Sequence, residues 1–175
     1  MLCSPLSAGT KPRGNGEDVE LADDETDVYH LLGILLRFLA RPANGKGYCL
    51  VELLVAPGAG PPPNRHPSDD EAFYVLDGAF DFMVDGATRR VGRGDFVQVP
   101  NGAVHAFTNA GPAPGRLLVI NAPGHAHVGF FSQAGEPMPK GTRDLPPPSG
   151  EPPDIPRLVE IGRRNGLEFL LDRPL

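Results

Sequence analysis

The sequence has few cysteines, no excess of basic residues and no long apolar run. Among its 175 residues the only cysteines are Cys3 and Cys49, so a framework of disulfide bonds is not expected. Cys49 lies between apolar residues, and we expect a buried, inert thiol there. The formal net charge of -6 argues against nucleic acid as a partner, because phosphate binding needs a basic surface.

Signals for membranes and secretion are also missing. No apolar run approaches the roughly 20 residues that a membrane-spanning helix needs. Residues 1–10 lack the basic start and the long apolar centre of a signal peptide. We therefore expect no membrane association and a cytoplasmic location.

The composition favours one compact domain built mainly from strands. Hydrophobic residues make up 40% and charged residues 22%, values typical of a globular chain. The 22 glycines and 21 prolines favour short strands with tight turns over long helices. We predict a disordered acidic arm over residues 1–27, a β-rich body over 28–135, and a Pro-rich segment with a helix over 136–175.

Local patterns predict the individual elements. The apolar residues 28–40 fit either a helix or a pair of strands. After residue 47, short strands alternate with turns, and Asp77-Gly78 and Asp85-Gly86 are typical of two-residue hairpins. Such spacing predicts an antiparallel sandwich or barrel. Near the end, Asp154 and Pro156 begin a predicted amphipathic helix that Gly166 ends.

Two histidines and one carboxylate stand out among these strands. His66, Glu71 and His105 together offer the two-His, one-carboxylate set that non-heme iron oxygenases use. They belong to two spaced patterns. The first pattern comprises Gly58, Asn64, His66, Glu71 and Gly78, and the second comprises Gly94, Pro100, Gly102, His105 and Asn109.

These patterns resemble the two signature motifs of the cupin superfamily. The second match is complete, whereas in the first Asn64 stands where the family has a histidine. Residues 71–78 are similar to the strand that follows the metal glutamate in single-domain quercetin 2,3-dioxygenase-like cupins. The resemblance covers roughly residues 28 to 172. It implies an all-β fold, a double-stranded β-helix (cupin or jelly-roll barrel) with a short C-terminal helical segment.

The resemblance also implies a metal site. It places His66, Glu71 and His105 at metal-ligand positions, a set that suits a divalent transition metal (Fe, Mn, Ni, Co or Zn). The amide of Asn64 could ligate the metal weakly, hold a metal-bound water, or make only a hydrogen bond. The altered position leaves a second possibility open, in which the barrel has kept its shape and lost its metal.

Two functions follow from these alternatives. One is a metal-dependent dioxygenase acting on a small phenolic, flavonol-like or diketone substrate, with Glu71 as the base that accepts the substrate hydroxyl proton. The other is a non-catalytic cupin that binds a small molecule, with or without metal. For assembly we expect a homodimer, since exposed sheet edges are otherwise a liability.

Several other side chains have simpler interpretations. We expect His125 and His127 to share one face of a strand, with a surface or dimer-edge role favoured over metal binding. In the acidic run Asp69-Asp70-Glu71 we expect only Glu71 to turn inward. Six aromatic residues are expected to line the core or a pocket: Phe73, Tyr74, Phe80, Phe82, Phe96 and Phe107.

Overall fold

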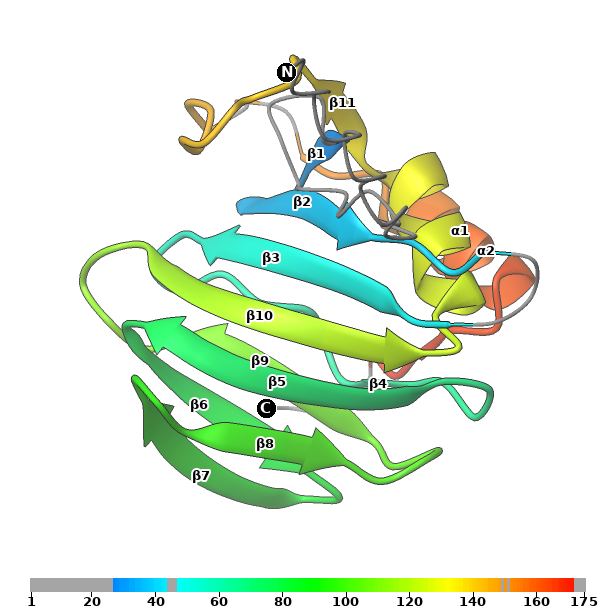
Figure 1. Ribbon diagram of the computed structural model, residues 1–175, viewed down its shortest axis with the longest axis horizontal. Helices are drawn as coiled ribbons and strands as arrows, with labels where there is room; N and C mark the ends of the chain where they lie inside the picture. Colours follow the sequence, from blue (N-terminus) through cyan, green and yellow to red (C-terminus); the bar gives the residue numbers. More distant parts are fainter. Residues whose placement is uncertain (1–26, 44–46, 149, 151, 172–175) are drawn as a thin grey trace, which may run out of the picture.

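The structure is a computed structural model that describes residues 27–43, 47–148, 150 and 152–171 (Figure 1). The predicted acidic arm, apart from Asp27, lies outside the described residues, and so does Cys3. Two antiparallel sheets face one another, and two short helices lie together at one end of the strands. This arrangement confirms the predicted all-β jelly-roll fold.

The larger sheet has seven strands in the order β11-β1-β2-β3-β10-β5-β8. In chain order its strands are β1 (Val28–Leu31), β2 (Ile34–Ala40), β3 (Cys49–Val55), β5 (Asp70–Asp77), β8 (Phe96–Val99), β10 (Gly115–Ala122) and β11 (Glu136–Met138). The smaller sheet has five strands in the order β12-β4-β9-β6-β7. Its strands are β4 (Asn64–Arg65), β6 (Ala79–Val84), β7 (Ala87–Gly92), β9 (His105–Asn109) and β12 (Glu168–Phe169).

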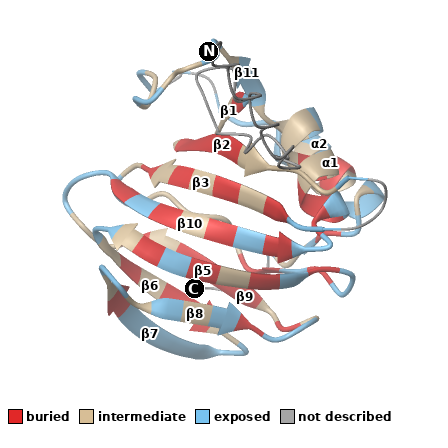
Figure 2. Ribbon diagram, viewed as in Figure 1, coloured by how far each residue is buried: buried red, intermediate tan, exposed pale blue. Residues whose placement is uncertain are grey.

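The core fills the space between the two sheets. Burial alternates along the strands, as β3 shows, where every second residue from Cys49 to Val55 is buried (Figure 2). Phe73 on the larger sheet meets Phe107 on the smaller one, with ring centroids 5.6 Å apart. The Cys49 thiol is fully buried, and burial raises its pKa to about 12, so the prediction of a buried thiol there is confirmed.

Two of the aromatic predictions are wrong. Tyr74 and Phe96 are 43% and 58% exposed and lie opposite one another on the outer face of the larger sheet. The alternation of strand side chains explains this position, because Phe73 and Val75 point into the core and Tyr74 between them must point out.

Tight turns set the order of the strands. The apolar residues 28–40 form a pair of strands, β1 and β2, joined at Leu32 and Gly33, which both have positive φ. Asp85 and Gly86 likewise join β6 to β7 with two positive φ angles, so the hairpin predicted there is confirmed.

The hairpin predicted at Asp77-Gly78 is wrong. The strands on either side of it, β5 and β6, belong to different sheets. Gly78 has a φ of +88°, and a Cβ on it would lie 2.9 Å from the Cα of Gly115. The same turn residues therefore serve here as a corner, where the chain crosses from one sheet to the other.

The two helices follow the last long strand. Gly124 is the N-cap residue of α1 (His125–Ala134), and Asp154 is the N-cap residue of α2 (Ile155–Arg164). The side chain of Asp154 accepts a hydrogen bond from the backbone N–H of Arg157. The start predicted for the second helix is thus confirmed. Neither helix is long and apolar enough to cross a membrane, nor is any other described segment helical over such a length.

Candidate metal centre

The three residues singled out by the motifs lie at the starts or ends of strands from both sheets. His66 directly follows β4, Glu71 is the second residue of β5, and His105 is the first residue of β9. All three are buried, with 2%, 6% and 3% of their surface exposed. The sheets therefore bring together at one point side chains that lie up to 39 positions apart in the sequence.

Both imidazoles point at one carboxylate oxygen. The Nε2 atom of His66 lies 3.1 Å from Oε2 of Glu71, and Nε2 of His105 lies 2.8 Å from the same oxygen. Two ligands at right angles, each about 2.1 Å from a metal ion, would lie about 3.0 Å apart. Each distance from Glu71 to an imidazole therefore fits a pair of neighbouring metal ligands as well as a direct hydrogen bond.

The hydrogen bonds of the Nδ1 atoms show which nitrogen of His66 and of His105 carries hydrogen. Nδ1 of His66 is 2.9 Å from the backbone oxygen of Asp69, and Nδ1 of His105 is 3.0 Å from that of Ala103. A carbonyl oxygen can only accept, so both Nδ1 atoms donate. In a neutral ring, Nε2 then turns a lone pair toward the anionic oxygen of Glu71. A cation, either a proton or a metal ion, is needed to make this contact favourable.

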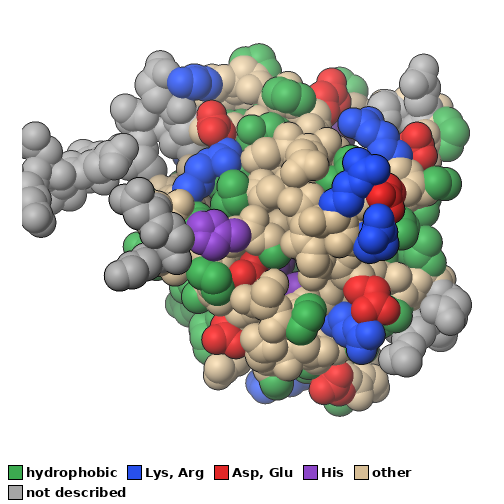
Figure 3. Space-filling view, turned by 90° about the vertical axis from the view of Figure 1, so that its right-hand side faces the viewer, with side chains coloured by type: hydrophobic (Ala, Val, Ile, Leu, Met, Phe, Trp, Pro, Cys, Tyr) green, Lys and Arg blue, Asp and Glu red, His purple; other side chains and the backbone are tan. Residues whose placement is uncertain are grey.

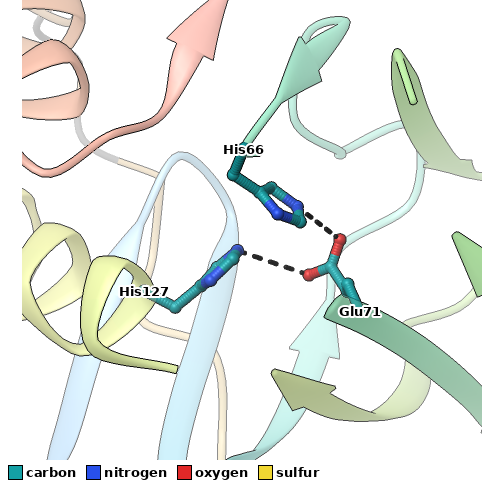
Figure 4. Close-up of side chains that lie close together, drawn as sticks. All are labelled: His66, Glu71 and His127. Atoms are coloured by element: carbon teal, nitrogen blue, oxygen red, sulfur yellow. Dashed lines mark hydrogen bonds and ion pairs between the residues drawn. The ribbon is translucent and has the colours of Figure 1, made fainter. Parts of the chain in front are cut away.

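A third imidazole joins the site from outside the motifs. His127 lies in the first turn of α1, is 3% exposed, and places Nε2 3.5 Å from Oε1 of Glu71 (Figure 4). Ligand atoms of His66, Glu71 and His127 all lie within 4.8 Å of one another, whereas His105 contacts Glu71 but does not belong to this group. The surface or edge role predicted for His127 is therefore wrong.

The error came from the expected secondary structure. On a strand, His125 and His127 would share a face, but on a helix residues two apart are turned about 200° from each other. His125 is accordingly exposed and His127 is buried. The preceding Gly124, with a φ of +83°, makes the turn into the helix, and a Cβ there would lie 2.4 Å from the Cβ of Cys49.

Asp69 holds this third imidazole in place. It is 1% exposed, so the prediction that only Glu71 of the acidic run turns inward is wrong. Its Oδ1 accepts a hydrogen bond from the backbone N–H of Gly124 at 2.9 Å, and its Oδ2 accepts one from Nδ1 of His127 at 2.8 Å. A carboxylate on one ring nitrogen directs the lone pair of the other nitrogen outward, a common arrangement around metal-ligating histidines; here that nitrogen, Nε2, lies 3.3 Å from Nδ2 of Asn121.

The pKa shifts follow from this dense pairing. Burial raises the pKa of Glu71, but its hydrogen bonds with His105 and His66 outweigh burial, and its pKa lies well below the ordinary range. Burial lowers the pKa of His66, but the hydrogen bond and charge of Glu71 outweigh it and raise that pKa. Burial raises the pKa of Asp69, but its hydrogen bonds with His127 and with the backbone N–H of Gly124, together with the charges of His127 and His66, outweigh burial and lower that pKa. Glu71 and Asp69 are therefore anionic at neutral pH.

Asn64 uses its amide nitrogen to join strands. Nδ2 donates to the backbone oxygen of Pro62 at 3.1 Å and to that of His105 at 3.2 Å. The hydrogen-bonding role, one of the three considered for Asn64, is thus present. Ligation by its amide oxygen stays a prediction. The imidazole that the motif lacks at Asn64 has a counterpart in His127, which reaches the same carboxylate from the helix.

Part of the site borders an apolar pocket of about 140 Å³. Asn64, Glu71, His105 and His127 are the only hydrogen-bonding side chains among the described residues that line it. The other side chains are apolar, and they come from the inner faces of the sheets, from α1 and from α2. The site can thus bring an uncharged molecule against one carboxylate and its imidazoles, away from bulk water.

Comparison with known proteins identifies the central part of the chain. Residues 51–121, which contain His66, Glu71 and His105, match the family model described as the cupin domain. This segment is a cupin domain. The cupin match ends at Asn121, so His127 lies beyond it.

Individual proteins similar to this chain extend the comparison beyond the matched segment. An uncharacterized protein of Methanocaldococcus jannaschii, MJ1618, is 28% identical over 97 residues, which cover 54% of this chain and 78% of that protein. A predicted oxalate decarboxylase from Thermotoga maritima matches with a TM-score of 0.53 and 17% identity over 59% of this chain and 97% of its own. An RmlC-like cupin from Shewanella frigidimarina matches with a TM-score of 0.51 and 21% identity, over 60% of this chain and 90% of its own. At these identities, the two structures show a shared fold alone.

Proposed function

We propose that this cupin is a metal-dependent oxidising enzyme, a dioxygenase, for an uncharged, oxygen-bearing small molecule. The substrate class is a phenol, a flavonol-like compound or a diketone. The observation that carries the proposal is a buried carboxylate, Glu71, that contacts three buried imidazoles and borders an apolar pocket together with two of them, His105 and His127.

The donor set fits a divalent transition metal. Three neutral imidazoles and one carboxylate suit Fe, Mn, Ni, Co or Zn. His66, Glu71, His105 and His127 would hold the ion, with Asp69 and two backbone carbonyls fixing the ring tautomers. When bound, such an ion supplies Lewis acidity that polarises the substrate oxygen.

The protein side chains at the pocket have separate roles in the proposed reaction. Glu71 is the only carboxylate that borders the pocket among the described residues, so it is the group placed to accept a hydroxyl proton from the substrate. The apolar walls exclude water and strengthen the electrostatic interactions at the site. Asp69 does not line the pocket and acts through His127 as a positioning residue.

One observation favours a non-catalytic, small-molecule-binding cupin as the second candidate. Glu71 is already paired with His66, His105 and Asn121 through direct contacts of 3.1, 2.8 and 2.8 Å. If His66 and His105 carry protons, these contacts satisfy the carboxylate without a metal ion. Binding of a ligand without turnover would then be the whole activity.

Oxygen consumption separates the two candidates. We expect the protein, loaded in turn with each of the five metals, to take up O₂ in proportion to the loss of catechol, acetylacetone or quercetin. With ¹⁸O₂, both oxygen atoms should appear in the product. Metal bound at one equivalent, with a compound bound and no O₂ consumed, would instead support the binding cupin.

The homodimer and the cytoplasmic location stay proposals. The outer face of the larger sheet carries Tyr74, Phe96 and Ile120 as exposed large apolar side chains, which a second copy of the chain would cover. The predicted boundaries of the arm, the body and the C-terminal segment also stay proposals.

A further inference from the structure

The C-terminal segment closes part of the pocket. Residues 155–171, which comprise α2 and β12 and are called the cap below, contribute apolar side chains to the lining: Ile155, Leu158, Val159, Leu167, Phe169 and Leu171. These residues lie 34 or more positions beyond the match to the cupin domain, which ends at Asn121. The cap therefore adds a wall that the matched barrel segment does not contain.

The cap is attached directly to the strand that leads to the metal centre. β12 pairs with β4, so that Phe169 lies opposite Asn64 and Glu168 opposite Arg65, with an ion pair of 2.7 Å between the latter two. The backbone N–H of Leu170 donates to the oxygen of Pro63 at 2.8 Å. The cap is thus held in a fixed register, only a few residues from His66.

Apolar packing joins the cap to α1. The rings of Phe169 and Phe130 have centroids 5.5 Å apart, and Leu167 is buried with Phe130 in a small cluster of its own. Gly162 lets α2 approach Phe169, since a Cβ there would lie 2.5 Å from the ring. This packing fixes the distance between the cap and the imidazole of His127, which is carried by the same helix as Phe130.

The cap keeps its charges outside the pocket. Glu160 pairs with Arg163 and Arg164 on the surface of α2, and Arg65 pairs with Glu168. On the side of the molecule where α1 and α2 lie, basic and acidic side chains accordingly sit next to one another (Figure 3). Among the described residues that line the pocket there is no lysine, arginine, serine, threonine or tyrosine. A charged group on a ligand would find no polar side chain there except those of Asn64, Glu71, His105 and His127.

The pocket volume limits the size of what it binds. A dry apolar cavity of about 150 Å³ accommodates benzene, and this pocket measures about 140 Å³. Leu32, Ile155 and Leu171 line the pocket yet are 41%, 37% and 54% exposed, so they form its mouth. One ring fits inside, and an apolar substituent can extend between these three side chains.

We infer that the cap determines specificity and selects an uncharged molecule with one ring, a hydroxyl or enol oxygen at the metal centre, and an apolar tail at the mouth. This inference rests on the proposed function, because it takes the same site as the place of reaction. It narrows the substrate class from phenols, flavonol-like compounds and diketones to one-ring compounds.

A pair of ligands of equal shape tests the inference. The compounds 4-propylphenol and tyramine differ by a methyl group in place of an ammonium group at the end of the tail. Titration calorimetry on the full-length, metal-loaded protein should give at least tenfold tighter binding of 4-propylphenol than of tyramine or quercetin. Equal affinity for all three would overturn the inference.

A variant of the cap should reverse this preference. Val159→Glu places a carboxylate in the cap wall, and we expect 4-propylphenol to bind about tenfold more weakly and tyramine several-fold more tightly. The matched control is Arg157→Gln, which makes the same change in net charge at an exposed position of α2 outside the lining. If Val159→Glu abolishes binding of both 4-propylphenol and tyramine, or if Arg157→Gln has an equal effect, the cap does not select the ligand.

The outcome does not depend on turnover. If metal binds and O₂ is consumed but Val159→Glu leaves the preference unchanged, the proposed function stands and the role of the cap is refuted. If the protein binds no metal but still prefers 4-propylphenol to tyramine, and Val159→Glu reverses that preference, the role of the cap stands and the proposed enzyme does not.

Discussion

Replacing Glu71 with glutamine is expected to lower metal affinity at least about 100-fold and to abolish O₂ consumption. Loss of a group that merely orients a ligand already costs about 10- to 100-fold, and Glu71 is itself the only anion among the four converging side chains. Its Oε2 faces both His66 and His105, and its Oε1 faces His127. A neutral amide supplies no charge against the metal and cannot take the substrate proton.

Competition with a chromophoric chelator measures the affinity in this experiment. Glu136→Gln is the matched control, because it removes the same charge at an exposed position. Glu136 lies on β11, which four strands of the larger sheet separate from β5 and Glu71. Wild-type affinity in the Glu71 variant would show that the carboxylate is a structural partner of the histidines and not a metal ligand.

The second large effect is expected at His127. His127→Gln should weaken metal binding about 100-fold, because it removes one of three imidazoles, while the barrel keeps its two motif histidines. Asp69→Asn should weaken binding about 10- to 100-fold, since the amide can turn its NH₂ toward Nδ1 and favour the wrong tautomer of the ring.

The helix itself provides the control for this prediction. His125→Gln changes the same residue type two positions earlier on α1, where the side chain is exposed, and should leave metal affinity unchanged. If His127→Gln behaves like His125→Gln, the imidazole of His127 serves only to anchor the helix to Asp69.

Some of this site is predictable from sequence because motif spacing encodes it. His66, Glu71 and His105 fall at the ends of strands whose alternation is clear, and a barrel can aim such positions at one point. Asn64 could likewise be recognised as the altered position. Its amide contacts, in contrast, depend on how close β4 lies to β9.

His127 and Asp69 were not predictable in the same way. The position of His127 depends on Gly124, which turns the chain from β10 into a helix that already includes His125 and His127. Asp69 stands in an acidic run that would ordinarily face water. Only the long-range contact between residues 69 and 127 buries both, and no local pattern reports a contact across 58 positions.

The fold shows a similar division. Hydrophobic alternation and the start of α2 at Asp154 followed from local chemistry. The turn at Asp77-Gly78 was predicted as a hairpin because a corner between sheets uses the same residues. The choice between the two rests on the contact of Gly78 with Gly115, which lies 37 residues later in the chain.

X-ray absorption on the Co(II)-loaded wild-type protein tests the central claim most directly, because it counts the imidazoles around the bound ion. The account predicts one bound cobalt per chain with three imidazole ligands, those of His66, His105 and His127. A count of two would remove His127 from the metal centre, and a protein that retains no cobalt would contradict the metal centre as a whole.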